Sequence, residues 1–322
     1  MIKYMNAGED ASRGSWLVRN RMTVLPLVAV IAYAAFIQWF WGWPVLLRQW
    51  AGIGLLPVIS ALVLLVGTYF IRCYRIYDYF PNETRGRFLA LLRVTQVHNL
   101  LNIMLPFRAG ETSFPILMRS EFAVPLTRST SALLLMRLLD LHALFAAAGI
   151  GLIIGRDDQA LGWSLWGLFL VSPLALFLLK GHALAVLQRH LPQKLGRLLV
   201  EVEAGLPANA LVFVRAWLMT VLNWSTKVAV LAWVLATMCV LPLAASFGGA
   251  LGGELSSVLP VHAPAGVGTY PAGITAGAIS FGAPAKGAAF DLLASASVNA
   301  HLLIVVSAVA GTLLSILLSP RR

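Results

Sequence analysis

Two long apolar segments of this chain are too broken to form single membrane-spanning helices. Residues 89–128 are interrupted by Pro and Gly at residues 105–111, and residues 243–285 are interrupted in the same way at residues 259–271. Backbone that leaves the helical pattern at bilayer depth survives only where protein or a water-filled cavity surrounds it. A pair of interrupted apolar segments is therefore the best sequence indication of a transport site inside a membrane protein.

The remainder of the chain is just as apolar. Of its 322 residues 59% are hydrophobic and 11% are charged, and its mean hydropathy is +0.81. A soluble domain carries about 25% charged residues, so we predict an all-α polytopic membrane protein that forms a single domain over residues 1–322. The formal net charge is +11, but the cations lie between apolar stretches and not in one basic run. We therefore expect no nucleic-acid partner.

Charge between the apolar windows predicts the topology. Windows long enough to cross a bilayer, which takes about 20 residues, lie at residues 24–47, 51–71, 129–155, 163–180, 211–241 and 286–319. The N-terminal arm, the region after the second window (with Arg72 and Arg75), residues 180–197 and the C-terminus are basic, whereas residues 156–159 are acidic overall. The positive-inside rule then predicts cytoplasmic N- and C-termini.

This topology makes a demand on the two broken segments. Residues 89–128 must begin and end on the cytoplasmic side, and residues 243–285 must begin and end outside. We therefore predict two re-entrant helical hairpins, one from each side, together with about six full spans. Residues 24–155 and residues 163–319 would then have the same element order, with the second half inverted, as in many transporters. Residues 182–206 have apolar residues at helical spacing and predict a cytoplasmic amphipathic helix at the membrane surface.

Ionisable residues inside the apolar segments are candidates for function. Each costs at least about 2.5–3.5 kcal/mol to place in the bilayer core, so each needs a partner or a polar cavity. Arg108 and Glu111 flank the first break: Arg108 suits a phosphate, which a guanidinium binds through two oxygens, and Glu111 would neutralise Arg108 or couple to a proton or cationic headgroup. Alternatively, both lie at the interface and only set topology. Arg137 and Asp140 share a helix face, as a structural ion pair or as a gate.

Further groups surround the second break and the neighbouring spans. The residues that we predict to contact the substrate, besides those above, are Asn102, Lys227, His262, Gly266, Gly268 and Tyr270. Glu254 and Asp291 join Glu111 as candidates for coupling transport to an ion. The histidines show no metal-ligand spacing, and neither clustered carboxylates nor a phosphate-binding glycine loop is found. We therefore expect no metal and no cofactor.

Two blocks of residues carry a resemblance to a known family. Pro106 with Arg108 to Glu111, and Arg137 to Asp140 on the next helix, are joined by a weaker third block, Leu259-Pro260 with Ala265 to Tyr270. In these blocks, and over essentially the whole chain, the sequence resembles the lysylphosphatidylglycerol synthase transmembrane region, also called the flippase-like domain family. The resemblance implies a multi-pass protein of the bacterial cytoplasmic membrane that moves a lipid between leaflets.

The resemblance also limits what is expected. Some members carry a soluble aminoacyl-transferase domain, which residues 1–322 lack, so we do not expect synthase activity. The lipids linked to the family are phospholipids, polyprenyl-phosphate-linked sugars and hopanoid-type lipids. The family pattern often places a Glu near Pro271, and this departure weakens a coupling role for the second turn.

These observations favour a lipid flippase or bidirectional scramblase over an enzyme. An anionic or lipid-linked headgroup would enter a polar cavity between the two hairpins while its tails stay in the bilayer. Two alternatives stay open: an intramembrane enzyme that acts on a lipid, which would need converging acids, and a non-transporting subunit of a cell-envelope complex. The sequence leaves open whether the chain forms a homo-oligomer.

Overall fold

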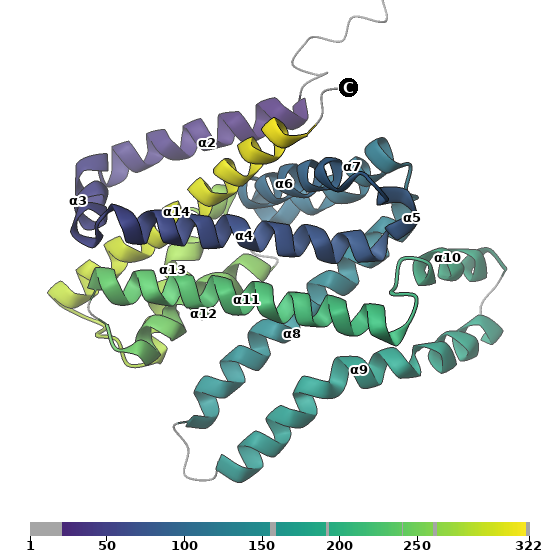
Figure 1. Ribbon diagram of the computed structural model, residues 1–322. Coiled ribbons are helices and arrows are strands. Elements are labelled where there is room, and N and C mark those ends of the chain that lie inside the picture. Colours follow the sequence, from purple (N-terminus) through teal and green to yellow (C-terminus); the bar gives the residue numbers. More distant parts are fainter. Residues whose placement is uncertain (1–20, 155–158, 191–192, 240, 260–262, 320–322) are drawn as a thin grey trace, which may run out of the picture.

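The computed structural model describes residues 21–154, 159–190, 193–239, 241–259 and 263–319, and every regular element in these ranges is a helix (Figure 1). Five helices in the described ranges are long and apolar enough to cross a membrane. They are α4 (Leu55–Tyr79), α8 (Leu126–Ile154), α9 (Gln159–His190), α11 (Ala210–Cys239) and α14 (Ala288–Leu318). The protein is thus an all-helical, multi-pass membrane protein, as the composition predicts.

The first predicted span is not one straight helix. Helix α2 (Arg21–Phe40) is followed by α3 (Trp43–Ile53), and the two are bent by 94° at the break, so that they add a sixth span if the pair is counted as one. Gly42 has φ +76°, a conformation that favours glycine, and Pro44 stands in the first turn of α3. The prediction of a continuous helix over residues 24–47 overlooked this break.

The second predicted span is longer than expected. Helix α4 continues to Tyr79, so Arg72 and Arg75 lie on a membrane helix and not in the basic loop to which the sequence reading assigned them. Aromatic and aliphatic residues between and beyond the two arginines keep the helix apolar. Only 4% of Arg75 is exposed. A short helix, α5 (Pro81–Thr84), then leads into the first hairpin.

The first hairpin breaks where the sequence predicts. Helix α6 (Phe88–Met104) stops before Pro106, because the residue before a proline favours extended backbone. The turn η1 (Pro106–Thr112) follows, and α7 (Ser113–Phe122) runs back. Phe107 and Arg108 have φ of 51° and 56°, which is rare for residues other than glycine. A Cβ at Gly110 would lie 2.4 Å from the Cα of Asn102, so the turn packs directly on α6.

The second hairpin consists of α12 (Leu243–Val258), the turn η2 (Pro264–Gly266) and α13 (Thr269–Ser280). Glycines let its two helices touch backbone to backbone. A Cβ on Gly252 would lie 2.2 Å from the carbonyl oxygen of Gly273, and one on Gly277 would lie 2.1 Å from that of Gly248. Small residues at such seams are the usual way in which membrane helices approach closely.

The two hairpins enter the bundle from opposite ends and meet at their tips. The turn η2 contacts both η1 and α6. Figure 1 shows α6 and α7 opening toward the end where α2 begins and α14 ends, and α12 and α13 opening toward the opposite end. The start of α2 and the end of α14 lie on the same side of the bundle (Figure 1), as the topology requires. Which side faces the cytoplasm, and the inverted relation of residues 24–155 to residues 163–319, stay predictions.

Helices α9 and α10 lie at the edge of the bundle (Figure 1). Residues 182–190 of the predicted amphipathic stretch 182–206 continue α9, and α10 (Gln193–Glu203) follows. Helix α10 and the residues after it dock on the start of α8, where Ser131 Oγ donates to the Val202 carbonyl at 2.9 Å and Arg128 Nε donates to the Ala204 carbonyl at 3.0 Å.

Candidate functional site

A group of charged side chains lies where the hairpin tips meet the long helices. We call it the charged cluster, and it comprises the cations Arg72, Arg75, Arg108, Arg137 and Lys227 and the carboxylates Glu111, Asp140 and Glu254. Its members come from α4, η1, α8, α11 and α12, so residues far apart in the sequence form one network.

Asp140 anchors one half of the charged cluster. Its side chain is fully buried, and it accepts from Arg75 at 2.8 Å, from Arg137 at 3.1 Å and from the indole Nε1 of Trp224 at 3.0 Å. The pair of Arg137 and Asp140 thus forms as its i, i+3 spacing predicts. Because Arg75 lies on α4, Arg137 on α8 and Trp224 on α11, Asp140 ties three helices together.

Glu111 anchors the tip of the first hairpin. Its carboxylate lies 2.9 Å from Arg137 Nε and is also hydrogen-bonded by Arg108. The guanidinium of Arg108 additionally donates to the backbone carbonyls of Ser257, at 3.2 Å, and of Val258. These carbonyls belong to the last turn of α12, where no further helical N–H is present to bond them. Arg108 therefore connects the first hairpin to the second.

Lys227 and Glu254 form the third part of the cluster. Their ion pair spans 2.9 Å, and Glu254 also accepts from the hydroxyl of Tyr270 at 3.1 Å. Both residues of the pair are buried. Lys227 Nζ lies 4.7 Å from the centre of the Trp224 ring, so this pair adjoins the Asp140 network through Trp224. The Tyr270 ring stacks on His301, with ring centres 4.9 Å apart.

The charged cluster holds more positive than negative charge. Arg72 makes no ion pair with any carboxylate of the described residues; it donates to Asn99 Oδ1 at 2.7 Å, and its buried Nε has no hydrogen-bond partner there. The buried Oδ1 of Asn102 likewise has none among those residues. With all eight groups ionised, two positive charges are uncompensated. Burying charge without a counter-charge is costly at any depth of a membrane protein.

A small cavity lies within the cluster. Its walls include Arg72, Asn102, Arg108, Arg137, Lys227, Glu254 and Tyr270, and its volume is about 50 Å³. Since one water needs about 10–15 Å³ by this measure, the cavity accommodates a few waters. Pockets for small molecules are far larger, about 300–1,000 Å³. The cavity is therefore too small to hold a lipid headgroup in this structure.

Eight of the predicted site residues come together here, and three others among the described residues, Gly266, Gly268 and Asp291, do not. Asp291 is exposed in the first turn of α14 and does not join the charged cluster, so its coupling role stays a prediction. Two other polar residues of α14 make a different contact: Gln49 of α3 donates to the hydroxyl of Ser295, and the amide of Asn299 donates to Gln49 Oε1. Gly266 and Gly268 shape the second turn with φ of +70° and +77° and do not line the cavity. His262 lies outside the described residues.

Sequence reasoning missed Arg72, Arg75 and Trp224. The two arginines are three residues apart and therefore share a face of α4, but they follow an apolar window and resemble the basic residues that set topology. Tyr74, Ile76 and Tyr77, which follow Arg72, were the signal that the helix continues. Trp224 stands three residues before Lys227, a spacing that brings their side chains together on one helix.

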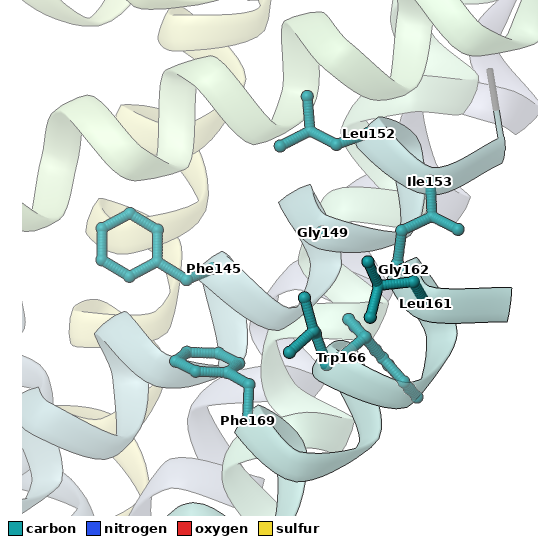
Figure 2. Close-up of a pocket in the computed structure, with 9 residues that line it drawn as sticks. Phe145, Gly149, Leu152, Ile153, Leu161, Gly162, Trp166 and Phe169 are labelled. Carbon is teal, nitrogen blue, oxygen red and sulfur yellow. The ribbon is translucent and has the colours of Figure 1, made fainter. Parts of the chain in front are cut away.

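One of the larger hollows in the described residues is apolar, whereas another, of about 360 Å³, has Arg87, Arg93 and Glu121 in its wall. A groove of about 490 Å³ between α8 and α9 is lined only by apolar side chains and glycine, which both helices contribute (Figure 2). Trp166, the one lining residue with a polar side-chain atom, donates its indole N–H to the carbonyl of Ala146 at 2.8 Å. This groove offers nothing that would fix a charged group. Within the described residues no three His, Cys, Asp or Glu side chains are placed to hold a metal ion.

Fold and site together define a multi-pass helical membrane protein with a cationic site between two broken helical hairpins. The chain belongs to the family of the lysylphosphatidylglycerol synthase TM region, whose model matches residues 23–311. The matched range contains both hairpins and the whole charged cluster. No curated protein and no solved structure matches the chain significantly. Membership of this family indicates a lipid-related function in the membrane.

Proposed function

We propose that this protein moves a membrane lipid with an anionic headgroup between the two leaflets, as a flippase or bidirectional scramblase. The observation that carries the proposal is the buried excess of two positive charges at the meeting point of the hairpins. A lipid phosphate would supply the missing negative charge. Phospholipids and polyprenyl-phosphate-linked lipids both carry phosphate, so these classes fit the site better than an uncharged hopanoid-type lipid.

The proposed setting is the cytoplasmic membrane of a bacterium, with both chain termini in the cytoplasm. The distribution of basic residues supports this orientation. Two hairpins that enter from opposite sides and meet at the centre support alternating access, in which the site opens to one leaflet at a time. The inverted order of the two halves would make the two openings structurally similar.

Each member of the charged cluster has a proposed role. Arg72 and Arg137 would bind phosphate oxygens through their planar guanidinium groups, and Asn102 would bond a neighbouring headgroup atom with its unpartnered amide. Glu111 would hold Arg137 and Arg108 until the substrate arrives. Glu254, which is buried against Lys227, replaces Asp291 as the candidate for coupling to an ion.

Arg108 takes the gating role that the sequence reading gave to the pair of Arg137 and Asp140. That pair lies within a single helix, α8, and its partners hold it firmly. Arg108 instead bridges the two hairpin tips. A headgroup can enter the cavity of about 50 Å³ only if these tips part, so the bonds of Arg108 to α12 must break during transport.

An intramembrane enzyme is favoured less by this geometry. Such an enzyme needs acids that converge on one point. Here Arg137 lies between Glu111 and Asp140 and pairs with both carboxylates. The carboxylate of Glu254 is paired with Lys227. Asp291 lies elsewhere. We therefore propose a transporter and not an enzyme.

Reconstitution tests the proposal. The purified protein is placed in liposomes that contain headgroup-labelled phosphatidylglycerol or a labelled polyprenyl phosphate, and a quencher that cannot cross the membrane reports leaflet exchange. We expect exchange well above that of empty vesicles for at least one of these lipids. Arg137→Gln should slow it by about tenfold or more, as expected for the loss of a charged contact, whereas Arg119→Gln, at an exposed position of α7, should not. Exchange equal to that of empty vesicles for every lipid would contradict the proposal and favour a non-transporting subunit.

A further inference from the structure

A second hollow adjoins the charged cluster and differs from it in chemistry. It lies between α8 and α11, has a volume of about 210 Å³, and is lined by apolar and small side chains that include Ala143, Ala147, Val221, Ser225, Ala229 and Phe247. Ser225 and Ala229 are exposed on the outer surface of α11, so the groove opens sideways between two membrane-spanning helices. The medium on that side is the hydrocarbon of the bilayer.

Trp224 separates this groove from the cavity of the charged cluster. Its ring lines both hollows. One end of the indole donates to Asp140 at 3.0 Å, and the ring face lies against the ammonium of Lys227 at 4.7 Å. The side chain is 4% exposed. Trp224 is thus a wall held in place by both halves of the charged cluster, with a polar, cationic space on one side and an apolar, laterally open space on the other.

We propose that the groove between α8 and α11 binds one hydrocarbon chain of the transported lipid and that Trp224 is the gate between this groove and the cavity of the charged cluster. When the gate is open, the lipid passes from its headgroup in the cavity to its chain in the groove. This inference rests on the proposed function and adds the route of the chain to it. A lipid whose headgroup occupies the cavity must have its chain leave through an apolar opening beside it. The groove between α8 and α11 shares a wall with the cavity, whereas the larger groove between α8 and α9 shares no residue with it.

The physical reason for a tryptophan at this place is that an aromatic ring closes an apolar opening while its N–H bonds a charged acceptor. While the Trp224 ring is held by Asp140 and Lys227, the charged cluster is sealed from the bilayer. An anionic headgroup that binds the cluster competes for Lys227 and weakens one of the two contacts. The gate would then loosen in response to the ligand and not before it arrives.

Photo-crosslinking tests the chain's route without relying on transport. Vesicles that hold the full protein are prepared with phosphatidylglycerol carrying a diazirine in one acyl chain, irradiated, and the adducts are mapped by mass spectrometry. We expect adducts in residues 143–150 and 221–229. Ala229→Trp should fill the groove and lower the yield there by about tenfold, since an overfilled apolar site excludes its ligand. Ala35→Trp is the matched control, because Ala35 is also an exposed alanine on a membrane helix.

Leaflet exchange in the same vesicles separates this inference from the function on which it rests. If Ala229→Trp exchanges lipid at the wild-type rate or keeps the wild-type adducts, the proposed route is wrong while translocation stands. If the wild-type protein gives no exchange at all, translocation is wrong, and the adduct map alone decides whether the groove binds a chain. Trp224→Phe, which keeps the ring and removes the bond to Asp140, should speed exchange several-fold; an unchanged rate would overturn the gate.

Discussion

The guanidinium of Arg108, at the tip of the first hairpin, donates a hydrogen bond to the backbone carbonyl of Val258, at the end of α12 in the second. Neither broken helix could end at bilayer depth without partners for its free backbone groups. This contact supplies one such partner and joins the two hairpins with a single side chain. The left-handed backbone at Arg108, φ 56°, belongs to the turn that carries it there.

Removing the Arg108 bridge should open the site. A hydrogen bond with a charged donor contributes about 1.5–3 kcal/mol, and 1.4 kcal/mol corresponds to tenfold in population, so Arg108→Ala should raise the open fraction by about tenfold or more. The measurement is the rate at which a water-soluble thiol reagent labels Ile103→Cys, a position in the cavity wall, after Cys73 and Cys239 are replaced by Ala. Arg119→Ala is the control, and equal labelling of the two variants would refute the bridge.

Lys227 and Glu254 should behave as a buried ion pair whose members depend on each other. Lys227→Met leaves a buried carboxylate unpaired, which costs about 3–5 kcal/mol, while replacing both members is far less costly. We therefore expect a large drop in thermal unfolding temperature in detergent for Lys227→Met and partial recovery for Lys227→Met combined with Glu254→Gln. Additive losses in the double variant would show that the two residues act independently.

The glycine seam of the second hairpin should not tolerate a methyl group. Gly252→Ala would place its Cβ 2.2 Å from a backbone carbonyl that cannot move aside, so it should lower stability by about 1–3 kcal/mol, as overpacking does. Gly167→Ala is the matched control on α9, where a Cβ meets nothing within 4 Å. It should be neutral or stabilise the helix by up to about 1 kcal/mol. Thermal unfolding of the two variants checks this, and similar stabilities would contradict the close packing.

From the positions of Asp291 and Glu254 we predict opposite effects of their substitution on the rate of leaflet exchange. Asp291 is exposed at the start of α14, so Asp291→Asn should leave leaflet exchange unchanged. Glu254→Gln removes the charge that balances Lys227 and should slow exchange by about fivefold or more, as the loss of a buried charge partner does. The same liposome assay measures both variants. A defect in Asp291→Asn alone would return the coupling role to Asp291.

The fold could be predicted from the sequence where hydropathy and charge dominate. Apolar length predicted the long helices α4, α8, α9, α11 and α14, and charge between the windows required two hairpins from opposite sides. The hairpins α6–α7 and α12–α13 do enter the bundle from opposite ends (Figure 1). Helix ends were less predictable. Gly42 breaks the first window because a single positive φ redirects the chain. The end of α4 was predicted too early because Arg72 and Arg75 resemble loop residues in the sequence, whereas in the structure Arg75 pairs with Asp140 inside the bundle.

The site was predictable in its local pairs and not in its long-range ones. Spacing along one helix brings Arg137 to Asp140, but no spacing relates Lys227 to Glu254 or Trp224 to Asp140, which lie on different helices. The same limit applies to the placement of Asp291. The sequence made it a candidate for coupling, but only the packing of α3 against α14 shows that the neighbouring Ser295 and Asn299 are hydrogen-bonded with Gln49.

Arg72 tests the central claim most directly, because it is the cation of the charged cluster that no carboxylate of the described residues pairs with. The measurement compares leaflet exchange of headgroup-labelled phosphatidylglycerol and phosphatidylcholine in liposomes, for the wild type and for Arg72→Gln. If the excess positive charge binds an anionic headgroup, the wild type exchanges the anionic lipid faster by about tenfold or more, and Arg72→Gln loses most of that preference. Equal rates for the two lipids in the wild type, or an unchanged preference in the variant, would contradict the account.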